Sequence, residues 1–114
     1  MLRRKQRQRD EMVPGMLEML ILKTVSRGAM HGYAIAQHIQ QTSEDILQVE
    51  EGSLYPALQR MQIKGWLVSE WRTTEHNRSA RFYELTAEGR EQLAAEMDKF
   101  GRLTSAIWRV LETA

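Results

Sequence analysis

The feature that most constrains the fold is a change of hydrophobic spacing at Gly65. On its N-terminal side, apolar residues recur at helical intervals in three segments, whereas on its C-terminal side they alternate over two short stretches before helical spacing returns. Helices are expected from after Gly15 to near Arg27, from His31 to about Gln41, and from an N-cap at Ser53 to Gly65. Pro56 then falls in the first turn of the third helix, where its missing N–H has no intrahelical partner in any case.

Two short strands are expected after Gly65, and together they predict a hairpin. The segments from Trp66 to Trp71 and from Arg81 to Leu85 are rich in aromatic and β-branched residues, and a polar loop from Arg72 to Ala80 joins them. Thr86 then caps a long last helix that reaches about Leu111. This order predicts a fold that is mainly α with a small β-hairpin (α+β), and a helix pair followed by a hairpin is typical of a winged helix-turn-helix.

Charge is unevenly distributed, although the formal net charge is only +1. Residues 2–9 carry five basic residues and no acidic one, and residues 60–81 carry five basic residues against two acidic ones. Residues 43–51, in contrast, hold four acidic residues and no basic one. Two basic regions on an otherwise acidic chain suit a polyanionic partner, although such runs are also common on solvated surfaces.

Several functional classes are disfavoured by the residues present. The chain has no cysteine, which excludes disulfides and thiolate ligands or nucleophiles. Its most apolar stretch, from Met16 to Val25, is too short and too charged to cross a bilayer, so we expect no membrane contact and a cytoplasmic location. His31, His38 and His76 have no partners at motif spacing, so we expect no enzyme, no metal site and no cofactor.

The third helix predicts a surface that binds double-stranded DNA. At 100° per residue, Leu54, Leu58 and Met61 share one side, and the opposite side carries amide, guanidinium, hydroxyl and phenol groups but no carboxylate. Gln pairs with adenine and Arg with guanine in the major groove. Any amphipathic surface helix shows a similar division, but the basic-tipped hairpin that follows favours DNA. The expected DNA contacts are Tyr33, Ser53, Tyr55, Pro56, Gln59, Arg60, Lys64, Arg72, Asn77, Arg78 and Arg81.

Two further groups of residues are assigned structural roles. Glu50 and Glu51 directly precede the third helix and would repel phosphate, so we leave them out of the DNA contacts. Their expected role is structural, because acidic residues stabilise the N-terminus of a helix through its dipole. Trp66, Trp71 and Trp108 are expected to be core or interface anchors.

The last helix predicts a contact between two copies of the chain. Leu93, Met97, Phe100, Thr104, Ile107 and Leu111 are spaced four and three residues apart in turn, which is the heptad spacing of a coiled-coil seam. Leu103 widens this stripe, so packing on the chain's own core is an alternative for part of the helix. Leu17 and Leu20 of the first helix are expected to add to the contact. A two-fold homodimer recognises a palindromic or near-palindromic operator.

These features divide the chain into three parts. Residues 1–12 are expected to form a flexible basic arm, which either follows the minor groove or only solubilises the chain; residues 13–86 form a winged helix-turn-helix DNA-binding domain; and residues 87–114 form a C-terminal dimerisation helix. The expected function is sequence-specific regulation of transcription. The alternative is a winged-helix protein-interaction module without specific DNA binding, and steep salt dependence of DNA binding distinguishes the two.

Three motif blocks resemble those of the PadR-like winged-helix transcriptional regulators, and look closest to their acidobacterial-type branch. The blocks are Met30-His31-Gly32-Tyr33, Glu51-Gly52-Ser53-Leu54-Tyr55-Pro56-Ala57-Leu58 and Arg81-Phe82-Tyr83-Glu84-Leu85-Thr86-Ala87-Glu88-Gly89. The resemblance runs from about Val13 to Leu111 and implies a dimeric repressor, often relieved by a small aromatic or drug-like effector at the dimer interface. The implied recognition positions are Ser53, Tyr55, Pro56, Gln59 and Arg60, with Tyr33 on the second helix. Where many relatives carry a Trp facing the dimer centre, this sequence has Phe100, which keeps the apolar surface but lacks an indole N–H.

Overall fold

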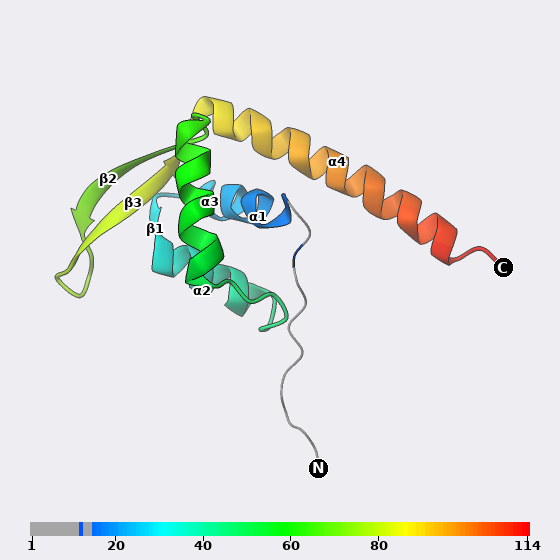
Figure 1. The fold of residues 1–114 in the computed structure, drawn as a ribbon, viewed down its shortest axis with the longest axis horizontal. Coiled ribbons are helices and arrows are strands. Elements are labelled where there is room, and N and C mark those ends of the chain that lie inside the picture. Colours follow the sequence, from blue (N-terminus) through cyan, green and yellow to red (C-terminus); the bar gives the residue numbers. More distant parts are fainter. Residues whose placement is uncertain (1–11, 13–14) are drawn as a thin grey trace, which may run out of the picture.

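The computed structural model describes Met12 and residues 15–114, so the arm expected for residues 1–12 lies outside the described residues except for Met12. In chain order the elements are α1 (Met16–Val25), β1 (Met30–His31), α2 (Gly32–Thr42), α3 (Glu51–Ile63), β2 (Leu67–Thr73), β3 (Ser79–Leu85) and α4 (Ala87–Leu111). Figure 1 shows α1, α2 and α3 gathered beside the strands, with α4 extending away from them. The predicted α+β winged-helix fold is confirmed.

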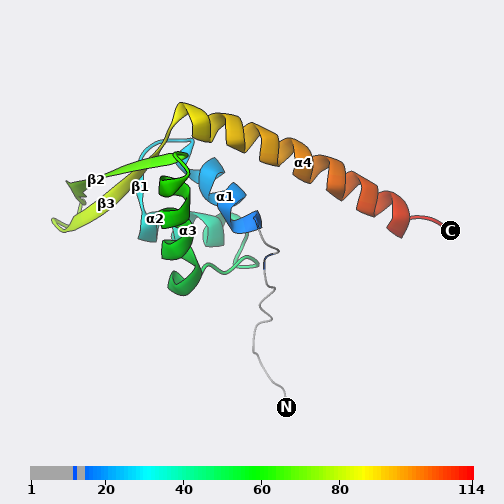
Figure 2. The same cartoon turned by 45° about the horizontal axis from the view of Figure 1, so that its top comes forward.

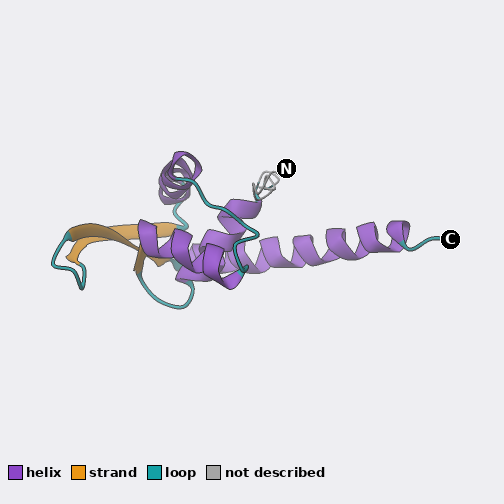
Figure 3. Cartoon of the chain, turned by 90° about the horizontal axis from the view of Figure 1, so that it is seen from below, coloured by secondary structure: helices purple, strands orange, loops and turns teal. Residues whose placement is uncertain are grey.

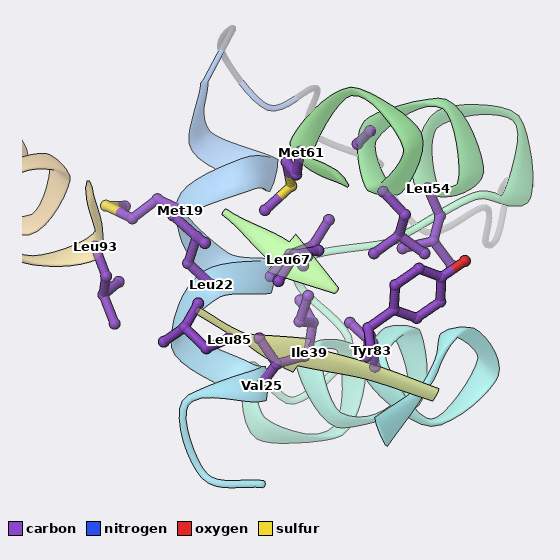
Figure 4. Close-up of a cluster of buried hydrophobic side chains, with 14 residues drawn as sticks. Met19, Leu22, Val25, Ile39, Leu54, Met61, Leu67, Tyr83, Leu85 and Leu93 are labelled. Atoms are coloured by element: carbon purple, nitrogen blue, oxygen red, sulfur yellow. The ribbon is translucent and has the colours of Figure 1, made fainter. Parts of the chain in front are cut away.

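The hydrophobic core lies where the first three helices meet one side of the sheet (Figure 4). Ile21 and Leu22 of α1, Ile35 of α2 and Leu58 of α3 are completely buried. Each buried side chain of this size stabilises the fold by roughly 1.5–3 kcal/mol relative to leaving it exposed. The other core residues are Met19, Val25, Ile39, Leu54, Ala57, Met61, Leu67, Tyr83, Leu85 and Leu93.

The sheet is antiparallel, with the strand order β1-β3-β2. β1 consists of Met30 and His31, which pair with Tyr83 and Phe82. A strand of two residues is too short to show an alternation of apolar and polar residues, so the sequence does not predict β1. β2, β3 and the turn between them form the projecting hairpin that is called the wing below.

Two of the predicted boundaries are wrong. α3 begins at Glu51, with Glu50 in the N-cap position, so Ser53 is not its N-cap and Pro56 is the sixth residue of the helix rather than part of its first turn. The predicted loop of the wing is too long as well, because β2 and β3 pair out to Thr73 and Ser79 and leave only residues 74–78 in the turn. Alternation fails in the outer half of the wing because polar residues occupy both sides there.

α4 starts at the base of the wing and leaves the body of the domain. Thr86 caps it as predicted, because its Oγ1 accepts the N–H of Gly89 at 2.9 Å and donates to the carbonyl of Gly65 at 2.7 Å. Gly89 and Leu93, both near the start of α4, are its buried residues. The C-terminal part of the helix extends away from the other elements, as Figures 2 and 3 show from two further directions.

Candidate nucleic-acid interface

α3 has one buried and one exposed side, and the predicted division is confirmed. Its buried residues are Leu54, Ala57, Leu58 and Met61. Ser53, Pro56 and Gln59 are exposed, and Ile63 is 78% exposed at the end of the helix. The exposed side therefore offers hydroxyl, amide and apolar groups to a partner.

Tyr55 lies against the start of α2 and brings two of the motif blocks into contact. A Cβ on Gly32 would lie 2.9 Å from Cε1 of Tyr55, so the ring occupies space that only glycine leaves open. His31, the residue before Gly32, caps α2 by accepting the N–H of Ala34 on its Nδ1 at 3.3 Å. Tyr33 is 64% exposed, and it borders the same groove of about 350 Å³ as Tyr55. The two tyrosines are thus presented together at the N-terminal ends of α2 and α3.

The lining of this groove includes two acidic residues. Asp45 and Glu51 line it together with glutamines of α2. Glu51 lies in the first turn of α3, where a carboxylate stabilises the helix by about 0.3–1 kcal/mol through the helix dipole. This position fits the structural role expected for Glu51 and makes the groove unsuited to a phosphate.

The tip of the wing is a tight turn that projects Asn77 and Arg78. Asn77 has a φ of 61°, in the left-handed region that asparagine adopts more readily than most residues. Thr74 organises the turn, because its Oγ1 accepts the N–H groups of His76 and Arg78, each at 3.2 Å. The exposed side chains of Asn77 and Arg78 suit the phosphate contacts expected of them.

Two of the arginines expected at the interface are paired with carboxylates. Arg60 Nε donates to Glu18 Oε2 at 3.1 Å, which links α3 to α1. Arg72 lies in β2 rather than in the loop, and its Nε donates to Glu70 Oε2 at 2.5 Å. Exposed ion pairs of this kind contribute about 0–1 kcal/mol, so a phosphate competes with them at small cost.

The remaining two cations lie over tryptophan rings. Lys64 Nζ is 4.7 Å from the centre of the Trp66 ring, and Arg81 Cζ is 5.3 Å from the centre of the Trp71 ring. Trp66 is partly buried against the core, as expected of an anchor. Trp71 is 64% exposed, so it does not belong to the core, and of the two expected roles only that of an interface anchor stays a prediction for this residue. In the structure the Trp71 ring contacts the guanidinium of Arg81.

The residues expected at a dimer contact fall into two groups. Leu93 is buried in the core of its own chain, and Leu17 and Leu20 are partly buried against that core, so these three retain less free surface than expected. The second group lies further along α4 and consists of the exposed Met97, Phe100, Leu103, Ile107 and Leu111 and the half-buried Thr104. Trp108 and Val110 are also exposed and widen this apolar side.

The three histidines lie in separate places: His31 at the start of α2, His38 within α2, and His76 in the turn of the wing. Within Met12 and residues 15–114, no three His, Cys, Asp or Glu side chains gather as metal ligands. No helix in the same part of the chain is long and apolar enough to cross a membrane.

A family model for transcriptional regulators of the PadR-like family matches residues 21–95, from within α1 to the first part of α4. The chain belongs to the PadR-like family. A PadR-family regulator from Eggerthella lenta is 28% identical and superposes with a TM-score of 0.76, covering 88% of this chain and 85% of that one. A PadR-like regulator from Bacillus cereus is 26% identical, also with a TM-score of 0.76, covering 88% of this chain and 95% of that one. These likenesses are to transcriptional regulators, so they point to a regulator rather than to an enzyme.

Two curated relatives of this PadR-like chain carry no assigned function. An uncharacterised 37.1 kDa protein in transposon TN4556 of Streptomyces fradiae is 38% identical over 97 residues, which are 85% of this chain. That alignment covers 26% of the Streptomyces protein, so the chain spans about a quarter of the relative's length. Protein X of Lysinibacillus sphaericus is 22% identical over 99 residues, covering 87% of this chain and 91% of that one.

Sequence reasoning missed three residues of the PadR-like chain that hold expected DNA contacts. Glu18 holds Arg60, and no local pattern links two residues that are 42 positions apart. Ser69 and Trp71 contact Arg81. Trp71 ends one predicted strand and Arg81 begins the other, so the predicted hairpin already placed these two residues opposite each other, as the register confirms.

Proposed function

We propose that this protein is a sequence-specific repressor that binds double-stranded DNA as a homodimer. The observation that carries the proposal is the exposed side of α3, where Ser53, Pro56 and Gln59 face solvent close to the exposed Tyr33 and Tyr55. An α-helix fits the major groove, where hydroxyl and amide groups hydrogen-bond to base edges. The reading of sequence is therefore assigned to α3.

The wing supplies the flanking phosphate contacts in this proposal. Arg78 at its tip and Arg81 on β3 are exposed, and no carboxylate of the described residues is paired with either. Phosphate contacts fix the position of a protein on the duplex, whereas base contacts determine which sequence it prefers.

The dimer is assigned to the C-terminal part of α4. Phe100, Leu103, Ile107 and Leu111 are each at least 45% exposed on a helix that extends away from its own core. Such a contiguous apolar surface marks an interaction site in a soluble protein. Two-fold pairing of these surfaces presents two copies of α3 to a palindromic operator.

An effector site is assigned between the two copies of α4. Phe100 and Trp108 expose aromatic rings on this helix. A small aromatic or drug-like molecule that packs against such rings would change how the two helices pair, and with them the spacing of the two α3 helices. Relief of repression by the effector follows from that change.

The proposal is tested by selecting duplexes that bind the full chain from a random-sequence library. We expect enrichment of a palindromic or near-palindromic motif, and binding that weakens steeply with salt because phosphate contacts release counterions. Failure to enrich any motif, with only background binding at low salt, would overturn the proposal in favour of a protein-interaction module.

The division of labour between α3 and the wing is tested with two substitutions. Gln59→Ala is expected to reduce the preference for the selected motif over random DNA by about fivefold to a hundredfold, the value of one good base contact. Arg78→Ala is expected to weaken binding to the selected motif and binding to random DNA equally, so that the preference between these two duplexes is unchanged. Equal effects of the two substitutions on both duplexes would show that α3 does not read the sequence.

A further inference from the structure

The two sides of the wing carry different charge. Residues that pair across β2 and β3 point to the same side of the hairpin, so the register sorts the wing into two sets. One set is Ser69, Trp71, Thr73, Ser79 and Arg81, and the other is Val68, Glu70, Arg72, Ala80, Phe82 and Glu84. The first set has one base and no acid, whereas the second has two acids and one base.

The side of the wing that carries the first set, with one basic residue and no acidic one, is the side that faces α3. Leu67 and Tyr83 have the same orientation as this set, and both are buried in the core. Ser69 also reaches α3 directly, because its Oγ donates to Oε1 of Gln62 at 3.2 Å. A duplex bound along α3 therefore meets the side of the wing that repels phosphate least.

Arg81 is held in a fixed place on this side by two contacts. Its Nη1 donates to Oγ of Ser69 at 3.2 Å, so a chain of hydrogen bonds runs from Arg81 through Ser69 to Gln62 of α3. The Arg81 guanidinium also lies 5.3 Å from the centre of the Trp71 ring. The two contacts fix Arg81 relative to α3 as well as to the wing.

These contacts leave Arg81 able to bind an anion. Trp71 covers a face of the guanidinium, while the five N–H groups of an arginine point outward in its plane, and only one of them is given to Ser69. Arg72, on the outer side, has a similar position over the Phe82 ring at 5.4 Å, but its Nε is bonded to Glu70. Among the described residues, Arg81 has no such carboxylate partner.

We infer that Arg81 binds one backbone phosphate of DNA between α3 and the wing, and that Trp71 and Ser69 are its positioning residues. The planar edge of a guanidinium matches two oxygens of a phosphate. Holding Arg81 in place before binding lowers the entropy cost of that contact. The inference rests on the proposed function only in requiring that DNA binds this side of the protein; it adds a defined phosphate site and two residues that build it.

The charge of the site is tested by measuring the affinity of the full chain for a random-sequence duplex over a range of salt concentrations. Arg81→Gln is expected to reduce the slope of log K against log salt by about one, the value of one phosphate contact. Trp71→Leu keeps the charge of Arg81 but removes its support, so we expect about a threefold to tenfold loss of affinity with little change in slope.

A double-substitution cycle then separates positioning from direct contact. If Trp71 acts through Arg81, Trp71→Leu costs no further affinity once Arg81→Gln is present. If Trp71 contacts DNA itself, the two losses multiply, and the inference is wrong. Ser69→Ala is put through the same cycle and provides a second route if Trp71→Leu unfolds the wing, while Trp71→Phe is expected to restore most of the affinity.

The phosphate itself is located with duplexes that carry one neutral methylphosphonate at a time. They are built on the motif selected above, which fixes the register of the protein. At one position in the duplex, the methylphosphonate is expected to weaken binding of the original protein but not of the Arg81→Gln variant. The Arg78→Gln variant, the matched control on the wing tip, is expected to be weakened by the same methylphosphonate. A protein that binds DNA but shows no such position refutes this inference alone; a protein that binds no duplex refutes the proposed function.

Discussion

Gly89 lies where α4 packs against the base of the wing and the residue that precedes it, Trp66. A Cβ at this position would overlap the carbonyl oxygen of Trp66 and lie 2.7 Å from Cδ1 of Leu85. A backbone carbonyl in a connection between two elements cannot move aside alone, so any larger residue pushes α4 away from the base of the wing. The motif block that ends in Gly89 shows the glycine, but only the structure shows what it touches.

Overpacking a folded protein costs about 1–3 kcal/mol, and Gly89→Ala is expected to destabilise the fold by an amount at the upper end of this range. The free energy of unfolding in urea measures it. Gly52→Ala is the matched control, because a Cβ there meets nothing within 4 Å, and it is expected to change stability by less than about 1 kcal/mol. Similar losses in the two variants would mean that crowding at Gly89 is not the cause.

The buried Tyr83 is expected to make the free energy of unfolding fall at alkaline pH. Burial raises the pKa of its hydroxyl above the ordinary value of 10.0, and the nearby Arg81 only partly offsets this. In the unfolded chain Tyr83 releases its proton at its ordinary pKa, whereas the folded chain retains it until the higher pKa is reached. Stability that is fully present below pH 10 is therefore lost as the pH rises through the folded pKa.

We expect the free energy of unfolding to fall less steeply above about pH 10 in Tyr83→Phe than in the original protein, because phenylalanine has no proton to release. Urea unfolding at a series of alkaline pH values measures the difference. Parallel curves for the original protein and Tyr83→Phe would contradict the assignment.

At the scale of elements, the sequence predicts the helices better than the strands. α1, α2 and α3 bury one side each, so the apolar residues within each helix, such as Leu54, Leu58 and Met61 of α3, recur at helical spacing and reveal the core. The outer half of the wing buries neither side, and its limits at Thr73 and Ser79 depend on backbone pairing that side-chain polarity does not report.

The candidate site was predictable to the extent that its residues lie on such periodic elements. The exposed side of α3, with Ser53 and Gln59, follows from the helix period alone. The partners of its arginines do not, because Glu18 and Arg60 meet only through the packing of α1 on α3. The start of α3 was misplaced because Ser53 has the chemistry of an N-cap, while Glu50 takes that position.

Thr86 connects the start of α4 to the end of α3 through one hydroxyl. Its Oγ1 caps α4 at Gly89 and donates to the carbonyl of Gly65 at the end of α3. Thr86→Ala is expected to destabilise the fold by about 1–2 kcal/mol, because a cap is lost and a carbonyl loses its partner. Thr86→Ser keeps the hydroxyl and is expected to recover most of this loss in urea unfolding; equal losses would assign the effect to the methyl group.

At the scale of the whole molecule, α4 determines the expected assembly. Phe100 lies on its exposed apolar side, so Phe100→Glu places a carboxylate where the proposed dimer would bury it. We expect the original protein to sediment as a dimer and its melting temperature to rise with concentration, because association stabilises the folded state. Phe100→Glu is expected to sediment as a monomer and to lose both the concentration dependence and the binding to a palindrome.

Ala95→Glu is the matched control for this substitution. Ala95 is exposed and lies five residues before Phe100, about 140° around the helix, so the same charge is added on the other side of α4. This variant is expected to remain a dimer. A Phe100→Glu protein that still sediments as a dimer would place the contact elsewhere on the molecule.

The position of Thr86 has a mechanical consequence for such a dimer. α4 is attached where α3 gives way to β2, because Thr86 contacts the carbonyls of both Gly65 and Trp66. Its 25 residues, at 1.5 Å each, form an arm of roughly 37 Å. A swing of about 5° at this joint displaces the far end by about 3 Å, close to the rise of one base pair. The angle at which α4 leaves this joint would then change the number of base pairs between the two half-sites that one dimer can span.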